Sequence, residues 1–486
     1  MIVKVAGFNI DIENIEKLNL NDATPETIAA SYAKISRDPR PIGEIRKDAR
    51  ENVKNARELN KRVVFDMGHS SIAEHAVFNI DIIGISRLAA EYIERFRLCS
   101  YTEKSQRYIK LGEDFVIPDG LNNKLENEFT TFIKDSFSLY EEIFKTLLPL
   151  IKERKSYKNE ELKKRDIEGL AMEDARYVLP LAVTTQLGLT ANARNIEYII
   201  KILASSPFAE LQKLSKSIFN ETIKYTPSLI RYTEPEKYFT FYWFSDPEIK
   251  KEPKGNNTPS NPDVKLISTH GDIDKIIAVH RFWSSSDSFE KSTKFSAGLS
   301  KAKKRELIHS IFECVTKHNQ MPRFFEAINL EYELTMSASC YAQFKRHRMM
   351  TQIPQQYLFE LGIEIPPIVR ECGFEKKILE HSHKSVDLYK KILEVNKYAA
   401  DYVILNCHRR RVYALLNARE LYHISRLRMD HHAQWEIQKI SRKMVELARE
   451  KVPFLFDMCC GKDEFDENLG RIQNENCHDS NSKHDV

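Results

Sequence analysis

Arginine, serine and glutamate side chains recur at short spacing between Arg95 and Tyr108, in the order Arg-Phe-Arg-Leu-Cys-Ser-Tyr-Thr-Glu-Lys-Ser-Gln-Arg-Tyr. Guanidinium groups match the geometry of phosphates and carboxylates, and hydroxyls add short hydrogen-bond donors. The apolar periodicity of residues 86–98 predicts an amphipathic helix, so the first arginines lie at a helix end. The pattern favours an anionic ligand such as a nucleotide, with an ordinary solvated helix end as the competing interpretation.

Two further motifs bracket this stretch. Gly68-His69-Ser70-Ser71 precedes residues 76–82, whose alternation of apolar and polar side chains predicts a half-buried strand. Asn192-Ala193-Arg194 begins a predicted helix with an apolar face. Asparagine is also a good helix N-cap, so Asn192 has a purely structural interpretation beside a functional one.

The same order of motifs occurs twice. Arg346-His347-Arg348 corresponds to Arg95-Phe96-Arg97, and Asn417-Ala418-Arg419 corresponds to Asn192-Ala193-Arg194. Each Asn-Ala-Arg motif stands fifteen residues after a Tyr-Val pair. A shared order and spacing indicates a duplicated domain.

The composition between the repeats and after them sets the predicted boundaries. Residues 234–262 are rich in Pro, Lys, Asn, Ser and Gly, which is typical of a linker. We therefore expect one repeat at 1–233 and a second, degenerate repeat at 263–462. The Asp/Asn/Ser-rich tail at 463–486 is predicted to be disordered.

Bulk properties exclude several classes of protein. The chain has 486 residues and a net charge of +4, too small to predict nucleic acid as a partner. It has no apolar run long enough to span a membrane. Its eight cysteines form no Cys-x-x-Cys pair and suggest free thiols in a reducing cytoplasm.

Histidine and arginine runs elsewhere invite other interpretations. His431 and His432 lack the spacing of a metal site, so no metal is predicted. The basic run His408-Arg409-Arg410-Arg411 is predicted to be a solvated helix face, with a phosphate contact as the alternative.

The stretch at 95–108 resembles the signature of the flavin-dependent thymidylate synthases. That signature is Arg-His-Arg, two residues, Ser, two residues, Glu, one residue, Ser, one residue, Arg-Tyr; only Phe96 departs from it. Residues 68–75, 175–181 and 192–194 look like further segments of the family. In the second half, similar segments are Asn417-Ala418-Arg419, Arg428 and His432-Ala433-Gln434-Trp435-Glu436-Ile437.

The resemblance implies an α+β fold with two homologous domains, each a small antiparallel sheet packed with long helices. It implies reductive methylation of dUMP to dTMP, with FAD as cofactor, NADPH as reductant and methylenetetrahydrofolate as one-carbon donor. Because single-domain members form tetramers, it also implies a homodimer of tandem chains with four domains. No side-chain nucleophile is expected, and an arginine beside the uracil favours its anionic form.

Residue roles follow from the resemblance, position by position. The catalytic positions are Arg428, which activates the pyrimidine, and His69, beside the flavin ring. Positions matching dUMP contacts are Arg95, Glu103, Ser105, Arg107 and Arg176. Positions matching FAD contacts are Ser71, Arg95, Arg97, Glu103, Asn192, Arg194, Arg346, His347, Arg348, Asn417 and Arg419.

Each repeat departs from the family pattern. Leu203 occupies the activating-arginine position in repeat 1, whereas Asp401 and Met321 replace the counterparts of Arg176 and His69 in repeat 2. Repeat 2 has also lost the glutamate, second serine and late arginine of the signature. Neither repeat holds a full set, so a working site is expected to need residues of both repeats.

Two alternatives stay open. The losses are compatible with a flavin- or nucleotide-binding paralogue without synthase activity, acting as a regulator or scaffold. They are also compatible with a related flavin-dependent enzyme that modifies another pyrimidine. The intact Glu-x-Ser-x-Arg segment at 103–107 favours the synthase.

Overall fold

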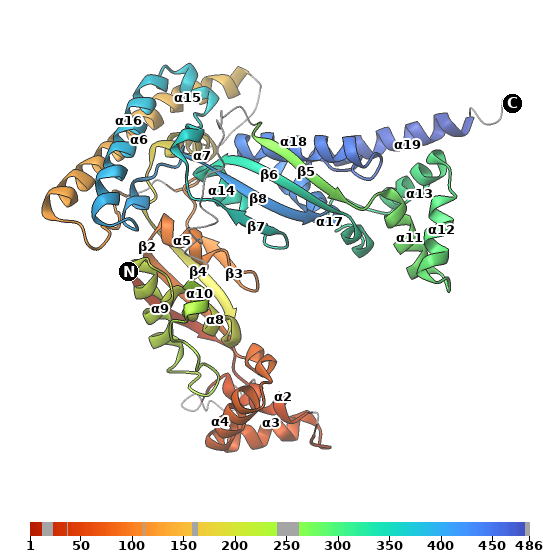
Figure 1. Ribbon diagram of the computed structural model, residues 1–486, viewed down its shortest axis with the longest axis horizontal. Helices are drawn as coiled ribbons and strands as arrows, with labels where there is room; N and C mark the ends of the chain where they lie inside the picture. Colours follow the sequence, from red (N-terminus) through yellow and green to blue (C-terminus); the bar gives the residue numbers. More distant parts are fainter. Residues whose placement is uncertain (12–22, 36, 110–111, 158–163, 241–261, 482–486) are drawn as a thin grey trace, which may run out of the picture. The chain divides into compact units, whose positions relative to one another are not determined.

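The computed structural model describes residues 1–11, 23–35, 37–109, 112–157, 164–240 and 262–481. Its contacts divide the chain into two compact units. Unit 1 comprises Met1–Asn256 and Ile365–Asn406, and unit 2 comprises Asn257–Glu364 and Cys407–Val486. Each unit contains one sheet with its own helices (Figure 1).

The sheet of unit 1 has the antiparallel order β1-β2-β4-β3. The central strand β2 (Val77–Ser86) buries Phe78, Ile80 and Ile82 while the residues between them face outward, as the alternation predicted. The other strands are β1 (Ile2–Phe8), β3 (Ser100–Glu103) and β4 (Thr184–Asn192).

The sheet of unit 2 repeats this order as β5-β6-β8-β7, which confirms the predicted α+β class with two homologous sheets. Val77 pairs with Asn192 in the first sheet, and Asn329 pairs with Asn417 at the matching place in the second. The strands are β5 (Val264–His270), β6 (Asn329–Ser337), β7 (Thr351–Pro354) and β8 (Arg409–Asn417).

The basic run at 408–411 corrects a prediction, because it begins β8 and is not a helix face. His408 and Arg410 are buried, and the Arg410 guanidinium lies 4.0 Å from the ring centroid of Tyr357. Alternate arginines of this strand therefore have aromatic or acidic neighbours within the unit, which the charge run alone could not reveal.

Helices of repeat 1 surround the first sheet. The helix α5 begins after Ser86, whose side chain accepts a hydrogen bond from the Ala89 N–H, and it ends at Ile93, earlier than predicted. The helices are α2 (Glu26–Lys34), α3 (Ile42–Glu51), α4 (Val53–Lys61), α5 (Arg87–Ile93), α6 (Asn123–Tyr157), α7 (Lys164–Ala175), α8 (Ala193–Ala204), α9 (Ala209–Thr222) and α10 (Lys237–Thr240).

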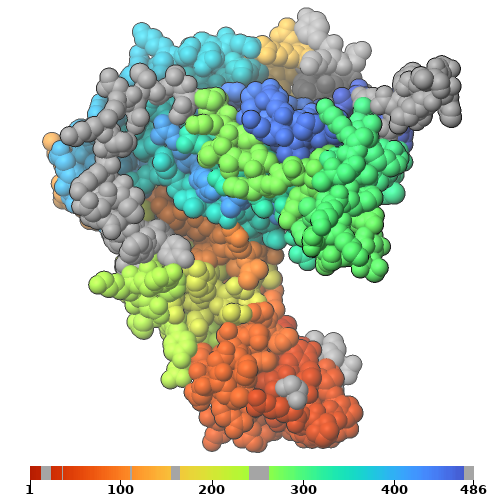
Figure 2. Space-filling view, turned by 45° about the vertical axis from the view of Figure 1, so that its right-hand side comes forward, coloured from red at the N-terminus to blue at the C-terminus, as the bar shows by residue number. Residues whose placement is uncertain are grey.

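Helices of repeat 2 include one cluster near the start of the repeat, formed by α11, α12 and α13 (green in Figures 1 and 2). The helices are α11 (Ile273–Ser284), α12 (Phe289–Ala297), α13 (Lys301–Glu313), α14 (Ala338–Phe344), α15 (Pro367–Glu371), α16 (Glu375–Val395), α17 (Ala418–Arg428), α18 (Trp435–Lys451) and α19 (Phe465–Asn481). None of the helices in the described ranges is long and apolar enough to cross a membrane.

The tail also differs from expectation, because α19 is a helix anchored to the core of unit 2. Phe465 and Ile472 are buried in that core, and Leu469 packs against it. Spaced three to four residues apart, these three side chains form an apolar stripe that a polar composition concealed. Residues 482–486 of the predicted tail, and 241–261 of the predicted linker, lie outside the described residues.

Segments of the two repeats pair with each other inside unit 1. Pro180 and Leu405, counterparts 225 positions apart, form an antiparallel bridge. The Leu181 N–H donates to the Ile404 carbonyl, and the Asn406 N–H donates to the Leu179 carbonyl. Equivalent segments thus meet about a local two-fold axis, as in an isologous dimer contact. The compact units therefore do not coincide with the predicted repeat boundaries.

Candidate active site

The signature loop of repeat 1 is held between β3 and α7 in unit 1. Glu103 ends β3, and Lys104 continues the pairing by donating its N–H to the Gln186 carbonyl at 2.9 Å. The Ser105 hydroxyl accepts the Arg107 N–H at 3.1 Å, which turns the chain. A Cβ added to Gly169 of α7 would stand 3.2 Å from the Arg107 carbonyl oxygen, so α7 lies directly against this loop.

Arg107 and Arg176 share the neighbourhood of one carboxylate. Arg107 forms an ion pair with Glu173 of α7, whose carbonyl oxygen accepts the Arg176 Nε–H at 3.2 Å. Arg176 is only 5% exposed, and its Nη2 has no hydrogen-bond partner in the described part of the chain. Burial lowers the pKa of Arg176 and the Glu173 charge opposes that shift, so two guanidinium groups face a single acid.

Asn406 links the loop to Arg176 from the second half of the sequence. Its side-chain amide donates to Gln106 Oε1 at 3.3 Å and to the Arg176 carbonyl at 2.9 Å. The Gln106 amide nitrogen is buried and has no hydrogen-bond partner among the described residues. The loop therefore presents two unsatisfied buried donors, which is the arrangement expected of an anion site. Sequence reasoning missed Glu173, Gln106 and Asn406, because none of them belongs to a local motif.

Glu103 is fixed by a partner that the motif does not contain. It is buried and forms an ion pair with Arg87 at the start of α5. Predicted as a contact of dUMP and FAD, Glu103 thus stands two residues from Ser105 with its charge already balanced.

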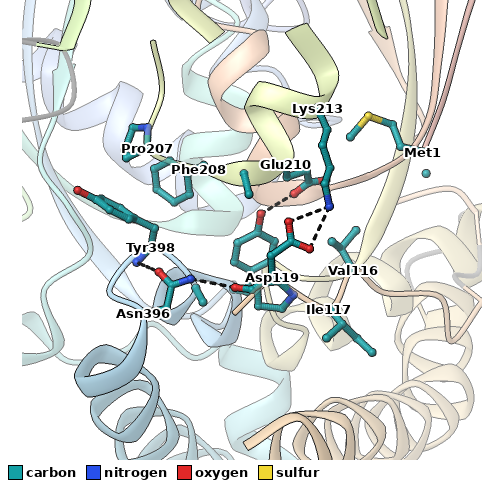
Figure 3. Close-up of a pocket in the computed structure, with 15 residues that line it drawn as sticks. Met1, Val116, Ile117, Asp119, Pro207, Phe208, Glu210, Lys213, Asn396 and Tyr398 are labelled. Carbon is teal, nitrogen blue, oxygen red and sulfur yellow. Dashed lines mark hydrogen bonds and ion pairs between the residues drawn. The ribbon is translucent and has the colours of Figure 1, made fainter. Parts of the chain in front are cut away.

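The start of α5 is itself anchored by Glu210 of α9. The Glu210 carboxylate accepts the Ser86 N–H at 2.7 Å, the Ser86 hydroxyl at 2.6 Å and the Tyr402 hydroxyl at 2.7 Å. These contacts line a cavity of about 240 Å³ in unit 1, at which Lys213 pairs with Asp119 (Figure 3). In unit 2, Glu436 accepts the Ser337 N–H and hydroxyl in the same way. This repeated anchor sets the helix that leads into each Arg-x-Arg segment.

The remaining predicted flavin residues of repeat 1 fall into two groups. His69 and Ser71 are exposed around the start of the 3-10 helix Ser70–His75. The same short helix carries Glu74, whose carboxylate pairs with Arg194 at 2.5 Å. Asn192 caps α8 by accepting the Asn195 N–H, so its structural role is confirmed and its flavin contact stays a prediction.

Arg95 and Arg97 follow α5 and differ in surroundings. Arg95 donates to Glu91 at 2.9 Å and lies 4.4 Å from the ring centroid of Tyr92. Arg97 is exposed. Phe96 between them packs its ring at 5.8 Å from that of Tyr198. The predicted FAD contacts of Arg95 and Arg97 stay predictions.

In unit 2, the Arg-His-Arg segment meets the predicted activating arginine. Arg428 donates from Nε to His347 Nε2 at 2.9 Å and from Nη2 to the Gln343 carbonyl at 3.1 Å. On its other side, His347 Nδ1 lies 3.6 Å from Glu420 Oε1. Burial and the neighbouring Arg428 hold the His347 pKa well below its usual range, so the ring is neutral and accepts from the arginine.

Two predicted departures are therefore linked. His347 and Arg428 form a hydrogen-bonded pair in repeat 2, whereas their counterparts in repeat 1 are the apolar Phe96 and Leu203. Losing one partner alone would leave the other polar group buried and unsatisfied, so replacing both is the less costly change. Arg346 is exposed and Arg348 partly exposed, on either side of the buried histidine.

A cavity of about 670 Å³ lies next to this pair in unit 2. Asn417 and Arg419, both predicted flavin contacts, line it together with Met321 at the His69 position. Asn417 caps α17 by accepting the Glu420 N–H, and Arg419 pairs with Glu326 at 3.3 Å. The Arg419–Glu326 pair corresponds to the Arg194–Glu74 pair of unit 1.

The loop of repeat 2 lacks the anion site of repeat 1. Pro354, Gln356 and Leu358 stand where Glu103, Ser105 and Arg107 would be. Asp401, at the Arg176 position, accepts a hydrogen bond from the Tyr389 hydroxyl at 3.4 Å. An acid and three neutral residues cannot bind a phosphate as the first loop can.

Potential metal ligands do meet at one place. Ligand atoms of Asp430, His431 and His432 lie within 4.8 Å of one another, with both histidines exposed. His431 Nδ1 is also 3.0 Å from Asp463 Oδ2, so the cluster is accounted for by an ion pair. The absence of a metal stays a prediction.

Comparison with known proteins identifies the relatives of this chain. A family model described as thymidylate synthase complementing protein matches residues 19–228 and 265–454. A flavin-dependent thymidylate synthase of Clostridium tetani is 32% identical over 215 residues, or 43% of this chain and 83% of that protein. A UPF0159 protein of Thermoplasma acidophilum is 21% identical over 495 residues, covering 92% of this chain and 97% of that protein.

A structure of the flavin-dependent thymidylate synthase of Helicobacter pylori, complexed with FAD and dUMP, is 20% identical and covers 48% of this chain and 100% of that chain, at a TM-score of 0.32. The family model matches the two predicted repeats separately, which agrees with the two equivalent sheets. The chain therefore belongs to the thymidylate synthase complementing protein family, with the family domain present twice in tandem.

Proposed function

We propose that this protein is a flavin-dependent thymidylate synthase, which methylates dUMP reductively to dTMP with methylenetetrahydrofolate as one-carbon donor and NADPH as reductant. The observation that carries the proposal is the anion site of unit 1, where buried Arg176 and Gln106 present unsatisfied donors beside Ser105 and Arg107. A nucleotide monophosphate matches this donor set in charge and geometry.

Arg428 is the residue proposed to act on the uracil ring. His347 and the Gln343 carbonyl fix the guanidinium, so it is oriented before substrate binds. A preorganised cation favours the N3-deprotonated pyrimidine without paying reorganisation during the reaction, typically about 10²–10³ in rate for one such donor. Repeat 1 provides the phosphate anchor and repeat 2 provides this arginine, so activity is proposed to require both repeats.

FAD fits the residues of the chain as cofactor. The cavity of unit 2 has a volume in the range of small-molecule sites and is lined by several cations, which suits a dinucleotide pyrophosphate. Asn417 and Arg419 would hold it there, and Arg95, Arg97, Arg194, His69 and Ser71 are the proposed contacts in unit 1. Bound reduced FAD supplies the hydride for the methylation. His347 and Glu420 keep Arg428 in place beside that cavity.

Tritium release from C5-labelled dUMP tests the proposal with purified full-length protein. Arg107→Ala should weaken dUMP binding, because a phosphate anchor acts in the ground and transition states alike. Arg428→Ala should instead reduce turnover by roughly 10²–10³. Leu203→Arg should leave activity in place. Full turnover by Arg428→Ala, or dUMP binding that is indifferent to Arg107→Ala, contradicts the proposal.

A second candidate is a flavin- or nucleotide-binding paralogue without synthase activity. The favouring observation is that the relatives reported above with full-length similarity are UPF0159 proteins, together with the apolar Phe96 and Leu203 of repeat 1. Rescue of growth in a thymidine-requiring host separates the two candidates. Rescue supports the synthase, whereas dUMP or flavin binding without rescue supports the paralogue.

A further inference from the structure

Arg426 of α17 is a buried cation whose charge the chain does not balance. It is only 6% exposed, and its Nε and Nη2 have no hydrogen-bond partner among the described residues. Its side chain lines the 670 Å³ cavity of unit 2. Burying a guanidinium without an anion is costly, so an uncompensated one facing a cavity indicates a missing partner.

The matching position in repeat 1 shows what that partner does. Lys201 follows Asn192 by nine residues, as Arg426 follows Asn417. Lys201 Nζ pairs with Glu236 at 2.8 Å, so there the chain itself provides the anion. Aromatic rings accompany both cations: Phe239 lies 5.8 Å from Lys201 Nζ, and Phe465 lies 5.4 Å from the Arg426 guanidinium carbon.

The segment that follows repeat 2 builds this corner differently. It provides Phe465 under Arg426, but in place of an acid it contributes Lys462 to the cavity wall. No ion pair engages Lys462 within the described residues. Both residues lie beyond the family match, which ends at residue 454. The C-terminal segment therefore adds positive charge where the corresponding segment of repeat 1 adds a carboxylate.

The acids of the cavity are already engaged. Glu326 pairs with Arg323 at 3.2 Å and with Arg419 at 3.3 Å. Glu420 faces His347. Neither acid forms a hydrogen bond or ion pair with Arg426 in the described structure, so the cavity keeps an excess of positive charge at this corner.

We propose that this cavity binds a phosphorylated small molecule, whose phosphate contacts Arg426 and Lys462. A phosphate accepts several N–H donors at once and matches the guanidinium fork. Asn417 and Arg419 line the same cavity, so the inference extends the proposed flavin site, but it requires only binding and no thymidylate synthesis.

Titration of the full-length protein with three probes tests the assignment: inorganic pyrophosphate, FAD, and riboflavin, which lacks phosphate. Calorimetry follows pyrophosphate, and flavin fluorescence follows the other two. Arg426→Gln should weaken pyrophosphate and FAD binding roughly 10- to 100-fold, as expected for a lost charge-assisted contact, and leave riboflavin unchanged. The matched control is Arg370→Gln, an exposed arginine paired with Glu375 at 3.2 Å.

A second variant keeps the test decisive if Arg426→Gln does not fold. Lys462→Glu places an acid at this corner, as Glu236 does beside Lys201. It should raise the melting temperature of the free protein and abolish stabilisation by pyrophosphate. Pyrophosphate binding without FAD binding supports the phosphate site and points to another phosphorylated ligand.

Two results overturn the inference: wild-type protein that binds no pyrophosphate or FAD, or equal affinities in Arg426→Gln and Arg370→Gln. Absence of tritium release with intact, Arg426-dependent pyrophosphate binding would refute the proposed synthase and leave this inference standing.

Discussion

Glu173 is expected to compete with the substrate phosphate for Arg107. The two side chains form an ion pair in unit 1, with exposed fractions of 18% for Arg107 and 8% for Glu173. A phosphate that binds Arg107 must displace this carboxylate or accept its repulsion. Glu173→Gln removes the competing charge, keeps the side-chain shape, and leaves the backbone carbonyl that accepts from Arg176.

The expected gain follows from the strength of the contact that is released. A hydrogen bond to a charged group is worth about 1.5–3 kcal/mol, and 1.4 kcal/mol is tenfold in affinity. Because the pair is largely buried, little of this is lost to solvent screening. Glu173→Gln should therefore lower the dissociation constant for dUMP about tenfold or more, even if stability falls because Arg176 loses its neighbouring charge.

Calorimetric titration of dUMP and deoxyuridine at two salt concentrations measures this effect. Deoxyuridine lacks the phosphate, so its affinity should not change. Glu221→Gln is the control, because Glu221 pairs with Lys224 on α9 and takes no part in the loop. Unchanged or weaker dUMP binding by folded Glu173→Gln would refute the reasoning, and equal tightening for deoxyuridine would show that the effect is unrelated to phosphate.

Three further predictions concern the other parts of the molecule. His347→Phe should cut turnover about 10- to 100-fold with little change in dUMP affinity, because Arg428 loses the acceptor that orients it; turnover equal to wild type counts against this role. Burial lowers the pKa of His381 to about 4, so the unfolded chain binds this proton first as pH falls. The stability that neutral His381 provides is complete above pH 6.5 and is lost between pH 6.5 and 4, by about 3 kcal/mol; denaturant titrations should show this loss, and His381→Gln should remove it. Arg97→Ala should lower flavin content on purification, measured by absorbance, and an equally yellow preparation would contradict the predicted contact.

Local sequence patterns predicted the elements that carry their own signal. Alternation predicted β2, and the two Asn-Ala-Arg motifs predicted the starts of α8 and α17, where Asn192 and Asn417 are N-caps. The repeated order of motifs predicted two equivalent sheets. These features depend on residues a few positions apart, whose hydrogen bonds and burial are set within one element.

The predictions that failed are those in which tertiary contacts overrode composition. The basic run at 408–411 became a strand because its alternate side chains find partners within the unit. The polar tail became α19 because three apolar side chains on one face meet the core of unit 2. Neither outcome can be read from charge or average polarity, since both depend on a surface built by distant residues.

The sequence by itself determined which residues could bind an anion or activate a pyrimidine: the motif residues Ser105, Arg107 and Arg176, and Arg428 by its spacing from Asn417. Only the tertiary structure decided their partners. Glu173 reaches Arg107 from another helix, Asn406 reaches Gln106 across 300 positions, and His347 reaches Arg428 across 81. A motif records residue types along the chain, whereas charge balance and orientation arise from groups that folding brings within hydrogen-bond distance.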